Sequence, residues 1–186
     1  MKNCKRFYFS LPCSRELKNV VKLQLLEKEH KDKIISIWKD KYKDDKNIIA
    51  DYVNIEKYEL IKKNCKNNSH FIIPHKNKNG YINFYSQFID CKLVFVTPLH
   101  DYNKFRTNSI PYITLNFFDE LKNKDIVLTK LSIINKIITK DEAYKFYNYI
   151  LSFYSDFNYF QYVYKFNNDS RNFSYNCFFD KFKHLF

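Results

Sequence analysis

The sequence predicts an α+β domain in which helices pack against an antiparallel sheet of about five or six strands. Three consecutive apolar or alternating segments with short connections predict an antiparallel meander over residues 70–98. A capping box formed by Thr139 and Glu142 opens an amphipathic segment and predicts a helix. Hydrophobic residues make up 45% of the 186 residues, which is enough for one domain with a buried core.

Helices are expected in most of the first third of the chain. Apolar residues at helical spacing predict one helix from Asn19, and a second helix, capped by Asp32, that buries Trp38. Residues 48–53 should form a short buried segment. Asn54 then caps a third helix, which is amphipathic and lies on the surface.

The single glycine of the chain predicts the tip of a hairpin. A strand over residues 70–74 should end at its proline, because proline has no N–H to donate to a ladder. Asn79 and Gly80 suit the positive φ of a turn. The alternating residues 81–88 and the more apolar residues 91–98 should form the next two strands of the meander.

The second half of the chain continues with strands and helices. Residues 99–109 form a long connection without a clear period, and residues 110–118 and 126–131 are strand candidates. After the capped helix, aromatic residues alternate over residues 158–166 and predict a last strand. Residues 168–182 should close the chain as a short helix.

The residue inventory argues against an enzyme. A P-loop needs two glycines and a dinucleotide fingerprint needs three, so a single glycine excludes both. The histidines and cysteines lack zinc-site spacing, and His70 and His75 should point to opposite faces of one strand. Asp119 and Glu120 are expected in a solvated turn, and Cys65 as a buried, inert thiol. We therefore expect no catalytic residue, no metal and no cofactor.

The net charge of +12 suggests a basic nucleic-acid (RNA) binding module as an alternative function. Only four of the 32 basic residues are arginine, the residue that gives bidentate contacts to phosphates and bases. Lysine, asparagine, tyrosine and phenylalanine are all abundant while glycine and proline are scarce, which indicates AT-rich coding. We therefore expect no nucleic-acid partner.

The N-terminal residues differ from the rest of the chain. Residues 1–18 are basic, mixed with aromatic and hydroxyl side chains, and contain no acid before Glu16. This composition is typical of a mitochondrial transit segment, and the alternative is a flexible N-terminus; residues 19–186 then form the single domain. The five cysteines without a CxxC motif indicate reduced thiols inside the cell. No apolar stretch approaches the ~18 residues of a spanning helix, so we expect no membrane insertion.

Four segments, in their order and spacing, resemble the family of mitochondrial ATP synthase assembly factors. They are residues 34–64 with EKYELIK, 70–88 with FIIP, 112–130 with LNFFDELK, and 139–154 with DEA. The resemblance implies a chaperone of the mitochondrial matrix that binds the unassembled β subunit of the catalytic head. It would prevent aggregation of that subunit until the α subunit docks, without catalysis or cofactor, and we expect a monomer.

Such a chaperone requires an exposed apolar surface beyond its own core. The aromatic-rich connection after the meander is the best candidate, because it exceeds the usual 2–6 residue loop. The residues that we predict to contact the β subunit lie in and around it: Phe84, Phe88, Tyr102, Phe105 and Tyr112. The alternative is that these aromatic side chains fill a second layer of the core.

Overall fold

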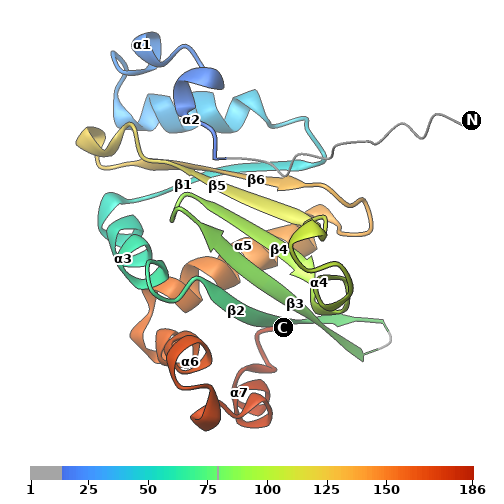
Figure 1. Cartoon of the computed structure of the whole chain (residues 1–186). Helices are drawn as coiled ribbons and strands as arrows, with labels where there is room; N and C mark the ends of the chain where they lie inside the picture. Colours follow the sequence, from blue (N-terminus) through green and yellow to red (C-terminus); the bar gives the residue numbers. More distant parts are fainter. Residues whose placement is uncertain (1–13, 79) are drawn as a thin grey trace, which may run out of the picture.

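The computed structural model describes residues 14–78 and 80–186, which form a six-stranded antiparallel sheet with helices on both faces (Figure 1). The predicted α+β class is therefore confirmed. The strand order is β1-β6-β5-β4-β3-β2. The strands are β1 (Ile48–Val53), β2 (His70–Asn77), β3 (Gly80–Ile89), β4 (Leu93–Pro98), β5 (Ile113–Phe118) and β6 (Val127–Ile133). The α-helices are α1 (Leu23–Leu26), α2 (Lys31–Lys41), α3 (Ile55–Cys65), α4 (Leu99–Phe105), α5 (Lys140–Ser155), α6 (Phe157–Asn168) and α7 (Tyr175–Phe182).

The first face of the sheet carries the main core, under α3, α5, α6 and α7 (Figure 1). Helix α5 begins with the predicted capping box and buries the stripe that its sequence predicts. Aromatic side chains fill much of this layer. Phe71, for example, lies 4.9 Å from the ring of Phe153 and 5.3 Å from that of Phe178, measured between centroids. Pairs at these distances add about 0.5–1.5 kcal/mol to their area burial.

The second face is covered in two separate places. Near β1 and β6, α1 and α2 form a smaller core in which Trp38 packs edge-on against Phe118 and its Nε1 donates to the carbonyl of Thr129 at 2.9 Å. Over β3, the ring of Tyr102 in α4 stacks on that of Tyr85 at 4.1 Å. The middle of the second face therefore lies between the layer formed by α1 and α2 and the helix α4.

Two elements differ from the sequence prediction. Residues 158–166 belong to helix α6 and not to a strand, because Asp156 caps a helix there and Tyr162 and Phe166, one turn apart, both pack on the main core. Residues 48–53, expected only as a buried segment, form the edge strand β1 paired with β6. The predicted number of strands is right, but one member is exchanged for another.

Several predicted element boundaries also change. Strand β2 continues through Pro74 to Asn77, which an edge strand allows because one side of its backbone needs no ladder partner. Asn77 pairs with Gly80, whose φ of 131° agrees with the predicted hairpin tip; Asn79 lies outside the described residues. His30, not Asp32, is the N-cap of α2. Residues 99–109 form α4 and a 3-10 turn instead of an irregular connection.

The segment before residue 19 is partly integrated into the fold. Leu17 is fully buried in the smaller core, and its backbone N–H donates to the Glu120 carboxylate. Residues 1–13 of the expected transit segment lie outside the described residues. In this structure the domain therefore includes residues on the N-terminal side of the predicted boundary.

Candidate functional site

The described residues hold no group of three or more histidine, cysteine or acidic side chains that could bind a metal ion. His70 and His75 lie on opposite faces of β2, as predicted. The Nδ1 of His70 shares a hydrogen bond of 2.7 Å with Tyr85 Oη on the second face of the sheet, whereas the ring of His75 contacts Phe146 in the main core. His75 is buried. Its Nε2 lies 3.2 Å from Glu142 Oε1.

Glu142 has a structural explanation within the capping box of α5. Its Oε2 accepts from the backbone N–H of Thr139 at 2.8 Å and from the Thr139 hydroxyl at 2.9 Å. Burial raises the pKa of Glu142, but these hydrogen bonds and that of His75 outweigh burial and lower the pKa overall. The pair ties β2 to the start of α5.

The acid pair after β5 is not a solvated turn, contrary to the prediction. The carboxylate of Asp119 is 13% exposed and binds Lys92 Nζ at 2.6 Å, while Glu120 holds the backbone of Leu17. Burial raises the pKa of Asp119, but the hydrogen bond and charge of Lys92 outweigh it and lower the pKa. Cys65 is buried as expected, and burial raises its pKa. Each of these groups has a packing role.

The five predicted contact residues lie in three different environments. Phe84 and Phe88 are 3% and 4% exposed and pack in the main core against Phe146 and Tyr154. Both therefore match the alternative of a core layer, and neither offers surface to a partner in this structure. Tyr102 is half-buried against β3 on the second face.

Phe105 and Tyr112 lie together in a groove that also contains Ile110 and Ile134. We call these four residues the apolar groove. It encloses about 640 Å³ at the end of the sheet where α4, β5 and β6 meet, with Asp101 and other polar residues at its rim. Phe105, Ile110 and Ile134 are 49%, 48% and 42% exposed.

Local backbone geometry builds the apolar groove. Arg106 takes a positive φ of 51°, which ends α4 and turns the chain back toward the sheet. The N–H of Tyr112 then donates to the Val96 carbonyl at 2.8 Å, and the Tyr112 carbonyl accepts from Ile134 N–H at 2.8 Å. Burial and the neighbouring Asp101 raise the pKa of Tyr112, so its phenol stays neutral. Exposed apolar side chains are thus presented from a fixed backbone.

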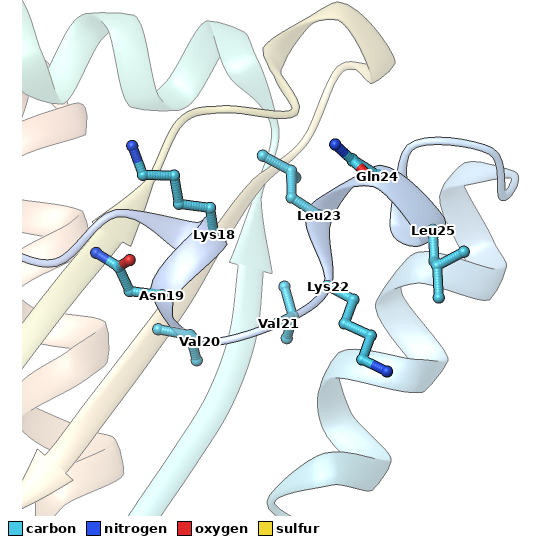
Figure 2. Close-up of a pocket in the computed structure, with 8 residues that line it drawn as sticks. All are labelled: Lys18, Asn19, Val20, Val21, Lys22, Leu23, Gln24 and Leu25. Atoms are coloured by element: carbon cyan, nitrogen blue, oxygen red, sulfur yellow. The ribbon is translucent and has the colours of Figure 1, made fainter.

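Another hollow, of about 690 Å³, lies along residues 18–25 of the N-terminal segment. All its lining residues come from one continuous stretch of chain. Figure 2 shows that the side chains point in different directions, with Lys18 and Lys22 directed away from each other. No polar groups converge on a point there, so this hollow lacks the geometry of a binding site.

A small polar pocket of about 140 Å³ opens in the middle of the second face. Its floor is formed by polar side chains of β5 and β6, with Arg15 at its side, and the apolar side chains of Val20, Phe118 and Ile134 also line it. Asn116 and Lys130 are directly opposite each other in the strand register, as are Thr114 and Ser132. The sequence shows that polar and apolar residues alternate along β5, but only the strand register with β6 shows that these polar side chains are neighbours.

Comparison with known proteins agrees with the order of segments in the sequence. None of the described helices is long and apolar enough to cross a membrane. No individual curated protein matches the chain significantly. A family model described as ATP11 protein matches residues 10–177, which is most of the chain. The chain therefore belongs to the ATP11 family of mitochondrial ATP synthase assembly factors.

Proposed function

We propose that this protein is a non-enzymatic chaperone that binds the unassembled β subunit of the ATP synthase catalytic head in the mitochondrial matrix. It keeps that subunit from aggregating until the α subunit docks. Membership in the assembly-factor family supports a role in ATP synthase assembly. The identity of the bound subunit, the matrix location and the absence of catalysis are parts of the proposal.

The apolar groove is the observation that carries this proposal. Three of its four side chains are between two fifths and half exposed, although they are large and apolar. Ile137, in the same loop as Ile134, is 74% exposed and adds to the apolar surface. Apolar and aromatic side chains gathered around a concavity are typical of protein-binding surfaces, whereas single exposed residues are not.

Capture of an apolar surface is sufficient for such a task. An unassembled subunit exposes the apolar area that an obligate interface later buries, and that area promotes aggregation. A protein that covers part of it needs no nucleotide, because displacement by the α subunit can drive release. We propose Phe105 and Tyr112 of the predicted set as contact residues, with Tyr102 beside them.

A charge substitution in the apolar groove tests the proposal. Phe105→Asp should keep the fold, since Phe105 is half exposed, and should weaken capture of purified β subunit by roughly tenfold or more, because a carboxylate is costly to desolvate. The readouts are light scattering of β subunit diluted from denaturant and co-purification. Circular dichroism and thermal melting report the fold.

Phe157→Asp is the matched control, because Phe157 is 84% exposed at the start of α6 and far from the apolar groove in the chain. It should capture β subunit as the wild type does. Equal capture by both variants, or equal aggregation with and without the wild type, would contradict the proposal.

Import into isolated mitochondria, followed by protease protection, tests the matrix location, and we expect the mature chain to retain Leu17.

A further inference from the structure

The polar pocket on the second face differs from the sheet around it. On the first face, β5 and β6 present Ile113, Leu115 and Leu131, which are fully buried in the main core. On the second face the same strands place Asn116 opposite Lys130 and Thr114 opposite Ser132. Polar side chains in neighbouring pairs on two central strands need partners, because water has limited access there.

The two basic groups of the pocket lack a carboxylate partner in the described chain. Lys130 is half-buried, and its Nζ lies over the ring of Tyr42, 5.1 Å from the ring centroid. Burial lowers the pKa of Lys130 and the charge of Arg15 lowers it further, which outweighs the opposite effect of the Asp45 carboxylate. Arg15 is exposed and Lys130 is half-buried, and together they place two positive charges beside the pocket, which favours an anion.

Asn116 gives a second, independent indication of a ligand. The residue is 9% exposed, and its Oδ1 is a buried oxygen without a hydrogen-bond partner in the described chain. An orphaned buried polar atom destabilises a fold by about 1–3 kcal/mol. Rotation of the amide by half a turn would place two N–H donors at the same position, where they could bind an oxygen anion.

We propose that this pocket, lined by Arg15, Thr114, Asn116, Lys130 and Ser132, binds the carboxylate of an acidic side chain carried by the captured segment of the β subunit. The proposal rests on the proposed function and specifies its ligand. Ile134 lines both the polar pocket and the apolar groove, so one segment can fill both. The pocket holds about 140 Å³, which suits a carboxylate group and not a nucleotide.

A small probe tests the pocket without the β subunit. Hexanoate joins a carboxylate to an apolar tail, and hexanol has the same tail without the charge. In a titration of the labelled protein followed by NMR, hexanoate should shift the amide signals of Thr114, Asn116 and Ser132, and hexanol should not. Equal shifts by both compounds, no shifts, or equally strong binding of inorganic phosphate would overturn the proposal.

Substitutions inside the pocket make the test specific. Lys130→Met keeps the aliphatic stem, and Arg15→Gln keeps a polar side chain; each should weaken hexanoate binding by roughly tenfold, as expected for loss of a charged hydrogen bond. Asn116→Asp supplies a carboxylate from the chain itself, so it should raise the melting temperature and abolish hexanoate binding. A lower melting temperature of Asn116→Asp would contradict the assignment.

The β subunit distinguishes this inference from the proposed function. If Phe105→Asp loses capture and Lys130→Met weakens it, both stand. If Phe105→Asp captures β subunit normally while hexanoate still binds at Lys130, the proposed function fails and the carboxylate pocket remains. If Phe105→Asp loses capture while Lys130→Met neither binds hexanoate more weakly than the wild type nor captures less, only the carboxylate pocket fails.

Discussion

At the scale of single residues, Trp38 connects the smaller helical layer to the sheet. Its indole is 1% exposed, packs edge-on against Phe118, and donates to the Thr129 carbonyl. The sequence predicts the burial of Trp38 from helical spacing. It cannot predict the hydrogen bond, because Thr129 lies 91 residues away in the chain.

Trp38→Phe removes that hydrogen bond and part of the ring while keeping an aromatic side chain. We expect the free energy of unfolding to fall by about 1–3 kcal/mol, measured by urea denaturation with circular dichroism. Ile37→Ala is the control in the same helix, since Ile37 is 37% exposed and should have a smaller effect. Equal losses for the two variants would argue against the described packing of α2.

Glu142 predicts a dependence of stability on pH. The pKa of Glu142 is lowered in the folded state. Its contribution to the free energy of unfolding is therefore complete above the pKa of the unfolded state, about 4.3, and is lost as the pH falls through the pKa of the folded state. Glu142→Gln should reduce stability at neutral pH by roughly 1 kcal/mol and should flatten the decline below pH ~4.5. Chemical denaturation at a series of pH values measures this, with the exposed Glu59→Gln as control. If the decline in stability at acidic pH were the same in Glu142→Gln as in the wild type, ionisation of Glu142 would not contribute to it.

The same scale shows how far the candidate site follows from sequence. The position of Phe105 and Tyr112 in an aromatic-rich connection is visible in the chain, and both lie in the apolar groove. Phe84 and Phe88 occur in an alternating strand, and alternation alone does not say which of its two faces joins the main core. Ile134 was missed because it joins the apolar groove only through the pairing of its backbone with Tyr112.

At the scale of elements, α6 shows the limit of periodicity. Its aromatic residues recur every second position, which is typical of a strand, yet the segment is a helix capped by Asp156. Aromatic side chains are so frequent here that Tyr162 and Phe166 also lie one helical turn apart and pack on the core, while Tyr164 is 53% exposed. Helix α5, with a capping box and a sparser stripe, was predictable.

Removal of the cap tests this assignment. The Asp156 carboxylate accepts from the backbone N–H of Asn158 at 2.8 Å, so Asp156→Ala should lower the free energy of unfolding by about 0.5–2 kcal/mol. Asp180→Ala is the control, because Asp180 is exposed and its ion pair with Lys183 lies at the surface. Thermal and urea unfolding measure both variants. A smaller effect at Asp156 than at Asp180 would contradict the cap.

At the scale of the whole molecule, the net charge of +12 and the apolar groove lead to different expectations for salt. Part of the basic charge is already paired across elements, as in Lys31 with Asp125 at 2.6 Å and Lys39 with Asp51 at 2.9 Å. Arginine, which binds phosphates in bidentate fashion, remains scarce. A lysine-rich composition is therefore compatible with a protein-binding role.

Salt titration separates this role from the RNA-binding alternative. Capture of β subunit through the apolar groove should change by only a few fold between low and physiological salt, with one carboxylate contact contributing the change. RNA binding would weaken by orders of magnitude over the same range, because each neutralised phosphate releases counterions. Fluorescence anisotropy with labelled β subunit and labelled RNA measures both. Tight, steeply salt-dependent binding of RNA alone would favour the alternative.

One edge of the sheet bears on the proposed capture of an aggregation-prone subunit. At the β2 edge, the side chain of Asn167 hydrogen-bonds both backbone groups of His70. Its Nδ2 donates to the His70 carbonyl at 2.6 Å and its Oδ1 accepts from the His70 N–H at 3.2 Å. Further along the strand, Pro74 has no N–H to donate. An incoming extended polypeptide finds no continuous row of donors and acceptors there. The β2 edge is thus a poor template for cross-β growth, so an aggregating chain could not extend its own sheet along this strand.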